Sequence, residues 1–266
     1  MDFLSKYLAP TGFIRMQAVS RCRFLLMSPE VENHVGKSPT AVIINGPSSS
    51  GKSTLSKALL ERLTDLADGD PQSAFVPVAF DDMLVLVSDK LYPINFVKLQ
   101  DGDLSRLISR EPNDGRAAWE YADESEAPGK HGGSPRVRLV LSPFVRNLVS
   151  GVHRGWGAHL ELGTNLVIDH FLQDSDWCEE MLEVLDATGC RQFFVGVYCA
   201  VEELERREVS RSDGQLEVRP LGLARRGDEL VHSHGLDYDV IVHSDVESTE
   251  ESVESIISAM RSGGYL

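Results

Sequence analysis

Cysteine is scarce in this sequence, and no cysteine belongs to a metal or redox motif. The 266 residues include four cysteines, with no C-x-x-C pair and no Cys/His cluster at zinc spacing. We therefore expect reduced thiols in a cytoplasmic protein, with neither a disulfide framework nor a structural zinc site.

Long apolar runs are also missing. No stretch approaches the roughly 20 apolar residues that a membrane helix needs, so we expect no membrane partner. Residues 1–37 lack the continuous apolar core of a signal peptide, because Arg15, Arg21 and Arg23 interrupt it. We predict an N-terminal extension here. It is either a poorly ordered segment or a variable helix, and an over-long start with Met27 as the true first residue is a third alternative.

Positive charge is in short supply. The chain has 26 lysines and arginines against 41 aspartates and glutamates, a net charge of −15. An acidic protein is a poor general binder of nucleic acid or anionic membranes, so we expect no nucleic-acid partner. A local basic pocket stays compatible with this charge, and the composition leaves a homo-oligomer open.

What the sequence does contain is a regular alternation of strand and helix patterns. Short apolar runs suited to buried parallel strands lie at 41–45, 74–80, 165–168, 193–199 and 240–242. Helical patterns lie between them at 55–66, 142–153, 175–187, 201–211 and 250–260. Strands that alternate with helices favour a doubly wound α/β sheet within one domain, residues 38–266.

One segment interrupts this alternation. Residues of about 100–135 are rich in Gly, Pro, Asp and Glu and form an acidic insert with little periodicity. A connection of this length is either a disordered insert or a functional lid. Trp119 and Tyr121 favour the lid slightly, because linkers seldom contain aromatic residues.

A phosphate-binding pattern follows the first predicted strand. Residues 46–53, GPSSSGKS, match G-x-x-x-x-G-K-[ST]. The glycines let backbone N–H groups approach phosphate oxygens at a helix N-terminus, the lysine can reach the β- and γ-phosphates, and the last serine can bind Mg²⁺. A plain Ser/Gly turn is the alternative. The candidate nucleotide-binding residues are Gly46, Pro47, Ser48, Ser49, Ser50, Gly51, Lys52, Ser53 and Thr54.

Carboxylates follow two of the other predicted strands. Asp169 ends the run NLVID and can hold a metal-bound water beside Ser53, with a helix cap as the alternative. Asp81 and Asp82 end the second strand, where ligands bind in parallel sheets. Either carboxylate can orient or accept the proton of an attacking hydroxyl. For His170 a packing role is favoured over catalysis.

Three classes of phosphate-binding protein then compete. A GTPase needs Asn-Lys-x-Asp to bind guanine, and the sequence contains no Asn-Lys pair. A regulatory ATPase needs a group that positions water. A small-molecule kinase needs an acceptor carboxylate and arginines that neutralise the transferring phosphate. The arginines available after the fourth strand include Arg206, Arg207, Arg211 and Arg219. Exposed pairs of Glu202 with Arg206 and of Glu203 with Arg207 are the alternative role.

Taken together, these residues resemble the chloramphenicol phosphotransferase-like family of P-loop kinases. The resemblance rests on IINGPSSSGKST, VAFDDML, LVIDHFL, RREVSRSDGQLEVRPLGLA and VHSHGLDYDVIVHSD, which span most of residues 40–245. It implies a P-loop NTPase fold of the nucleoside-kinase type: a three-layer sandwich with a mainly parallel five-stranded sheet and a helical lid. It also implies phosphorylation of a small-molecule hydroxyl by Mg²⁺ and ATP, in the founding case on an antibiotic, and hence a link to antibiotic resistance.

The resemblance assigns roles to particular positions. The proposed catalytic aspartate aligns with Asp81, and the lid arginines fall on Arg207, Arg211 and Arg219. The segment near His243 and Ser244 would lie by the adenine.

The sequence departs from the family pattern on the acceptor side. Five residues, Gly214–Val218, lengthen the lid, and a frequent glutamine is replaced near Gly227. Residues 1–37 and 100–135 have no counterpart. The acceptor is therefore left open between an antibiotic-like alcohol and a nucleoside or nucleotide sugar, and a regulatory ATP-binding protein stays an alternative.

Overall fold

The computed structural model describes residues 38–84, 108–109, 118–133, 135–212 and 220–266. The predicted N-terminal extension and most of the region from 85 to 117 lie outside the described residues. The domain boundaries predicted from the sequence stay predictions.

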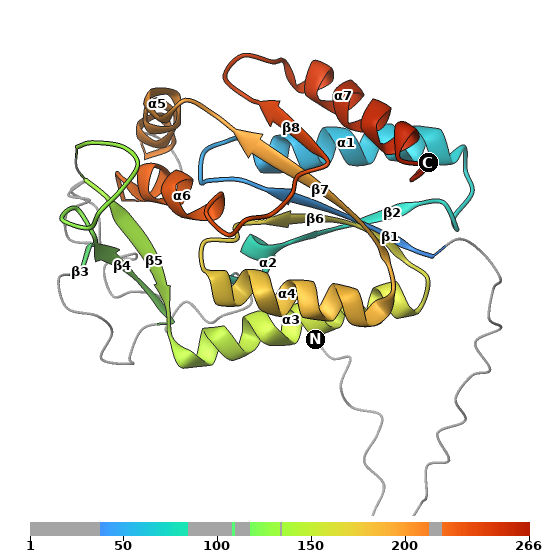
Figure 1. Ribbon diagram of the computed structural model, residues 1–266, viewed down its shortest axis with the longest axis horizontal. Helices are drawn as coiled ribbons and strands as arrows, with labels where there is room; N and C mark the ends of the chain where they lie inside the picture. The colour runs from blue at the N-terminus through green and yellow to red at the C-terminus, as the bar shows by residue number, and fades with distance from the viewer. Residues whose placement is uncertain (1–37, 85–107, 110–117, 134, 213–219) are drawn as a thin grey trace, which may run out of the picture. The chain divides into compact units, whose positions relative to one another are not determined.

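A parallel sheet of five strands organises the fold (Figure 1). Its order is β2 (Phe75–Ala79), β6 (Asn165–His170), β1 (Thr40–Asn45), β7 (Arg191–Tyr198) and β8 (Val240–His243). All neighbouring strands in it run parallel. The five predicted strands are confirmed, with ends shifted by at most two residues.

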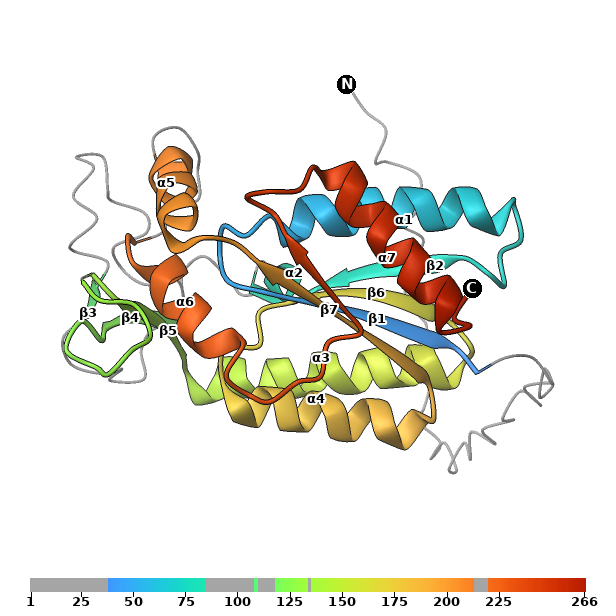
Figure 2. The same ribbon diagram turned by 45° about the horizontal axis from the view of Figure 1, so that its top comes forward.

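Helices cover both faces of this sheet. The first face carries α1 (Lys52–Ala67) and α7 (Thr249–Ser262), and the second carries α3 (Pro143–Glu161) and α4 (Ser175–Thr188), as Figures 1 and 2 show. Because strand side chains alternate, Val42 and Ile44 pack in the first layer and Ala41 and Ile43 in the second. The three-layer α/β architecture predicted from the sequence is confirmed.

A second, smaller sheet contains β3 (Ile108–Ser109), β4 (Trp119–Asp123) and β5 (Val137–Leu141). Strands β4 and β5 are antiparallel, and β3 pairs parallel to β4. Trp119 and Tyr121 are buried against a core that includes Val137 and Leu139. Of the two alternatives for the acidic insert, a disordered segment does not fit residues 119–123, which form β4 and pack in this core.

Two helices follow β7: α5 (Val201–Ser212) and α6 (Leu223–Val231). They lie on either side, along the chain, of the segment that the family resemblance predicts as the arginine-bearing lid. The segment 213–219, which contains Arg219, lies outside the described residues. Glu208 of α5 is buried and accepts hydrogen bonds from the backbone N–H groups of Gly222 (2.7 Å) and Ala224 (2.8 Å). This carboxylate caps α6 and ties the two helices together on either side of the lid segment.

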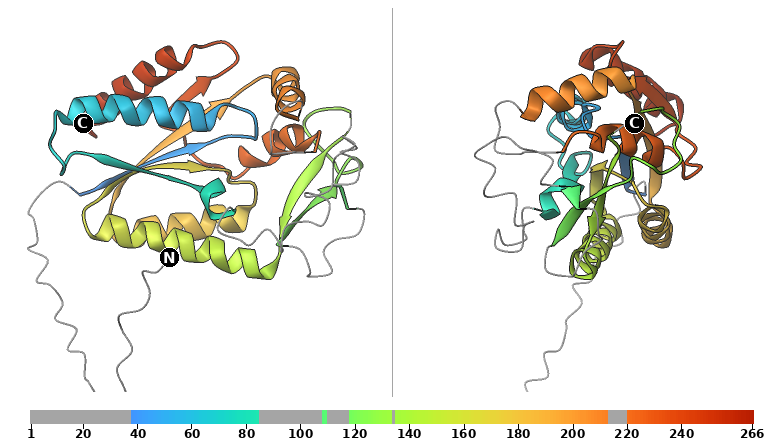
Figure 3. Two further views of the ribbon diagram at one scale, coloured as in Figure 1. Left: turned by 180° about the vertical axis from the view of Figure 1, so that it is seen from behind. Right: turned by 90° about the vertical axis from the view of Figure 1, so that its left-hand side faces the viewer.

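Helix α6 also lies beside the smaller sheet (Figure 3). The N–H of Val137 in β5 donates to the carbonyl of Gly222, and Arg136 forms an ion pair with Glu229 at 3.1 Å. No helix in the described part of the chain is both long and apolar enough to cross a membrane.

Candidate active site

The phosphate-binding loop joins β1 to α1. Lys52 is the first residue of α1, and Gly51 caps the helix with a φ of 88°, in the left-handed region that glycine adopts without strain. Ser49 has a φ of 64°, a conformation that costs a non-glycine residue about 1–2 kcal/mol. Backbone strain of this kind is typical of ligand-binding loops.

The three serines of the loop are buried. Among the described residues, the hydroxyls of Ser49 and Ser50 have no hydrogen-bond partner. A buried polar group without a partner costs about 1–3 kcal/mol. Two such groups in one strained loop fit a ligand that supplies acceptor oxygens, and a phosphate group does so.

Ser53 and Asp169 meet at the start of α1. The Ser53 hydroxyl donates to Oδ2 of Asp169 at 2.7 Å, and the β1–β6 register places Asp169 opposite Ile44. Hydroxyl and carboxylate oxygens are the ligands that Mg²⁺ prefers. In the described residues no group of three or more His, Cys, Asp or Glu side chains can hold a metal ion. The Ser53–Asp169 pair is the candidate magnesium site because it brings a hydroxyl and a carboxylate together at the start of α1.

Charge around Asp169 favours a bound cation. Burial raises the pKa of this carboxyl, while Lys52 and the Ser53 hydrogen bond act to lower it. Asp81 and Asp82 also raise the pKa, so their carboxylates act on Asp169 from nearby. The negative charge of Asp81 and Asp82 therefore disfavours the ionised form of Asp169, and a bound cation would offset this effect.

Lys52 is directed back onto its own loop. Its ammonium group donates to the carbonyl of Pro47 at 2.9 Å and lies 5.8 Å from the centre of the Phe171 ring. The charge is therefore held against the phosphate-binding loop.

Asp81 and Asp82 are exposed in the first turn of α2 (Phe80–Leu84), directly after β2. The preceding residue, Phe80, is buried and stacks on His170 (5.1 Å) and Trp177 (5.4 Å). This stacking anchors the start of α2. Because both carboxylates are exposed, the geometry leaves the choice between them open.

His170 is a packing residue, as the sequence indicates. It is fully buried and its Nε2 lies 2.9 Å from Nε2 of His153 on α3. Burial lowers the pKa of both rings, that of His153 to about 4. Both rings are therefore neutral near pH 7.

Arg207 connects α5 to the phosphate-binding loop. Its guanidinium donates to the carbonyl of Ser244 (2.7 Å), the hydroxyl of Ser244 (3.2 Å) and the carbonyl of Ser49 (3.4 Å). It also pairs with Glu203 at 2.7 Å, which confirms the i, i+4 pair. Arg206 pairs with the same Glu203, so the expected pairing with Glu202 is replaced by an i, i+3 pair. Arg211 lies in α5, and its side chain is outside what the structure describes.

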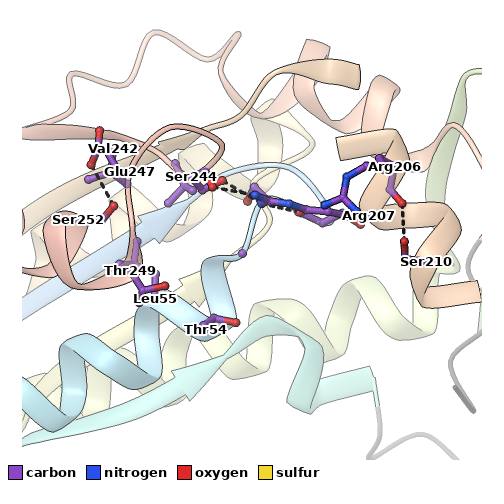
Figure 4. Close-up of a pocket in the computed structure, with 14 residues that line it drawn as sticks. Thr54, Leu55, Arg206, Arg207, Ser210, Val242, Ser244, Glu247, Thr249 and Ser252 are labelled. Carbon is purple, nitrogen blue, oxygen red and sulfur yellow. Dashed lines mark hydrogen bonds between the residues drawn. The ribbon is translucent and has the colours of Figure 1, made fainter. Parts of the chain in front are cut away.

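A cavity of about 410 Å³ opens beside the loop (Figure 4). Its walls come from the phosphate-binding loop, α5, the ends of β7 and β8, and the start of α7. They include Ser49, Gly51, Thr54, Arg207, Ser244, Glu247 and Thr249. The volume suits a small ligand. Ser244, which the resemblance associates with the adenine, lines this cavity.

Comparison with known proteins identifies the family. A family model described as chloramphenicol phosphotransferase-like protein matches residues 125–261, just over half of the chain. The chain belongs to this family. The match includes Asp169, the arginines of α5 and the segment around Tyr238, whereas the phosphate-binding loop precedes it. No curated protein matches the sequence.

Solved structures support the same fold. A protein from Chloroflexus aurantiacus, reported as a candidate kinase, is 14% identical, with a TM-score of 0.51 over 85% of this chain and 98% of that one. A gluconokinase from Sinorhizobium meliloti is 15% identical (TM-score 0.48, 86% and 96% covered). The APS kinase of Mycobacterium tuberculosis, solved with AMPPNP and APS, is 11% identical (TM-score 0.49, 85% and 99% covered). The first of these shows that this chain shares the fold of that candidate kinase. Membership of the chloramphenicol phosphotransferase-like family supports a kinase that transfers phosphate.

Proposed function

We propose that the protein is a cytoplasmic phosphotransferase that moves the γ-phosphate of ATP to a hydroxyl of a small molecule. Antibiotics and secondary metabolites are the acceptors to test first. The observation that supports this most directly is the meeting of Ser53 with Asp169 beside a strained loop that has two unpartnered hydroxyls. A loop of that kind holds phosphate, and the pair beside it holds a hard cation.

Each residue then has a physical task. Backbone N–H groups of residues 48–53 bind the β-phosphate, and Lys52 neutralises charge on the β- and γ-oxygens. Ser53 and Asp169 would hold a magnesium ion, which would supply further charge neutralisation. Asp81 orients or accepts the proton of the acceptor hydroxyl, with Asp82 as the alternative.

The arginines divide into two groups. Arg207 binds the carbonyls of Ser49 and Ser244 and lines the cavity, which supports a task on the nucleotide side. Arg211 and Arg219 then stay the candidates for neutralising the transferring phosphate when the lid closes.

The test is an ADP-release assay with MgATP, with and without a panel of alcohol-bearing antibiotics, nucleosides and metabolites. Release that an acceptor stimulates supports a kinase, and the stimulating compound names the acceptor class. Slow hydrolysis that no acceptor changes would instead favour a regulatory ATP-binding protein.

A further inference from the structure

Asn45, the last residue of β1, has a fully buried amide whose two N–H groups both have partners. It is 0% exposed. Nδ2 donates to the carbonyl of Val231 (2.8 Å) and to the hydroxyl of Tyr238 (2.8 Å). Oδ1 accepts from the backbone N–H of Leu172 at 3.1 Å. An amide buried in an apolar sheet is retained at low cost only when its groups are paired in this way.

The three partners belong to three separate segments. Leu172 follows Asp169 by three residues, on the chain that leaves β6. Val231 is the last residue of α6, the helix that follows the lid segment. Tyr238 precedes β8. Gly46 begins the phosphate-binding loop directly after Asn45. The Asn45 side chain therefore joins the start of this loop to the segment beyond Asp169 and to α6.

Tyr238 is itself held firmly. Its ring lies against Gly196 of β7, where an added Cβ would be only 2.8 Å from the ring. Its oxygen lies 2.9 Å from Nδ1 of His232, and the His232 ring stacks on Tyr198 at 3.9 Å. Burial lowers the pKa of His232 to about 4, so its ring is neutral near pH 7. The tyrosine oxygen accepts the hydrogen bond from Asn45.

We propose that Asn45 is a positioning residue that sets the phosphate-binding loop relative to Asp169 and thereby aligns Ser53 and Asp169 for Mg²⁺. The inference rests on the proposed function, because it assumes that the loop binds MgATP. The β1–β6 ladder pairs Asn45 with His170, next to Asp169, and the amide extends this link past the end of the ladder to Leu172. Groups that orient metal ligands typically change metal affinity by about 10- to 100-fold when removed.

A purely stabilising role is the competing explanation, and Gln173 offers a matched control. Its amide is 1% exposed, and it donates to the carbonyl of Leu139 (2.8 Å) and accepts from the N–H of the same residue (3.1 Å). It is a buried amide of the same kind on the same post-β6 segment. Its partner, however, is β5 and not the phosphate-binding loop.

The experiment measures ATP affinity by calorimetry, once with EDTA and once with Mg²⁺. The affinity with Mg²⁺ divided by the affinity with EDTA is called the magnesium gain. We expect Asn45→Ala to lower this gain about tenfold or more, with little change in ATP affinity in EDTA. Tyr238→Phe removes one of the three bonds and should lower the gain about threefold. Gln173→Ala should lower the melting temperature and keep the gain of the wild type.

The outcomes separate the two proposals. A folded Asn45→Ala variant with the full magnesium gain, or an equal loss in Gln173→Ala, overturns the positioning role alone. If Asn45→Ala does not fold, Tyr238→Phe decides, and an unchanged gain in that variant overturns the role. A wild-type protein that binds no ATP in either condition contradicts the proposed function, and the positioning role falls with it.

Discussion

The hydroxyl of Ser53 donates a 2.7 Å hydrogen bond to Asp169, which lies 116 residues further along the chain. The bond joins the first turn of α1 to the end of β6, two positions that the parallel sheet brings to the same edge. Two hard oxygen ligands thus converge beside the phosphate-binding loop.

Asp169→Asn tests the magnesium site. The amide keeps the size of the side chain and can still accept from Ser53, but it loses the charge that attracts a cation. We expect kcat to fall about 100- to 1000-fold and the Mg²⁺ concentration for half-maximal rate to rise. A magnesium titration of initial rates measures both. The control Asp186→Asn removes a carboxylate that contacts Gln192 at the end of α4 and should behave as the wild type.

Lys52→Ala and Asp81→Asn should separate binding from chemistry. Without the Lys52 ammonium, ATP binding weakens and transfer is abolished. Without the Asp81 carboxylate, ATP binding stays intact and kcat falls by about 100-fold or more, because the acceptor proton loses its base. Steady-state kinetics beside ATP affinity check this. A near-normal kcat in Asp81→Asn with a large loss in Asp82→Asn would assign the base to Asp82.

Arg207→Ala should weaken nucleotide binding more than it slows chemistry. The guanidinium joins the carbonyls of Ser49 and Ser244 across the cavity, and its loss lets the two walls separate. We expect KM for ATP to rise about tenfold, because the variant loses hydrogen bonds from a charged group. The change in kcat should be smaller. Arg62→Ala is the matched control, because Arg62 pairs with Glu254 in an exposed ion pair. A fall in kcat at unchanged KM would instead assign Arg207 to the transferring phosphate.

The buried His153 predicts a dependence of stability on pH. Burial lowers its pKa from 6.5 to about 4, against a smaller opposing effect of Glu180. Between these values the unfolded chain takes up a proton that the folded chain does not. The free energy of unfolding therefore falls as pH decreases through this window, by about 3 kcal/mol in all, and the full contribution is present above pH 6.5.

Urea unfolding of the wild type and of His153→Phe at a series of pH values measures this effect. In this window, the slope of the free energy of unfolding against pH should be smaller in the variant by about 1.4 kcal/mol per pH unit. His170 shifts in the same direction, so some slope remains. Identical slopes in the two proteins would show that His153 is protonated in the folded state.

Trp119→Ala tests the smaller sheet. Trp119 is 4% exposed within the core cluster that includes Tyr121 and Val145. Its truncation should lower the free energy of unfolding by about 3–5 kcal/mol. Glu126→Ala, at an exposed position in the β4–β5 connection, should change it by less than about 0.5 kcal/mol. Chemical unfolding measures both, and equal effects would contradict the burial of Trp119.

Local patterns made the centre of the site predictable. Residues 46–53 follow a fixed spacing because phosphate binding needs a tight turn at a helix N-terminus. This spacing predicts the turn from one short run of sequence. Asp169 was found because a carboxylate after a buried strand is visible in one short run. The order of strands, by contrast, is set by packing between segments more than 100 residues apart.

The smaller sheet was missed although it had a signal. Trp119 and Tyr121 flank the polar Glu120, and the buried Val137, Leu139 and Leu141 alternate with the half-buried Arg138 and Val140. The surrounding Gly, Pro and acidic residues hid this period of two. A search for alternation within the acidic segment would have found β4.

Asn45 and Arg207 could not be assigned from the sequence. Asn45 is a polar residue at the end of an apolar strand, a signal that something pairs with it, but its partners come from three distant segments. Arg207 was a candidate for a phosphate clamp or for an ion pair with Glu203. The structure gives it the ion pair and a contact with Ser244, which only the packing of α5 against the end of β8 determines.

The central claim is that phosphate passes from ATP to a small alcohol, and label transfer tests it most directly. ATP labelled at the γ-phosphate is incubated with Mg²⁺, the protein and the acceptor that most stimulates ADP release, and the products are separated. The account predicts label on the acceptor with the wild type and none with Lys52→Ala. Label found only as inorganic phosphate, with every acceptor in the panel, would contradict it.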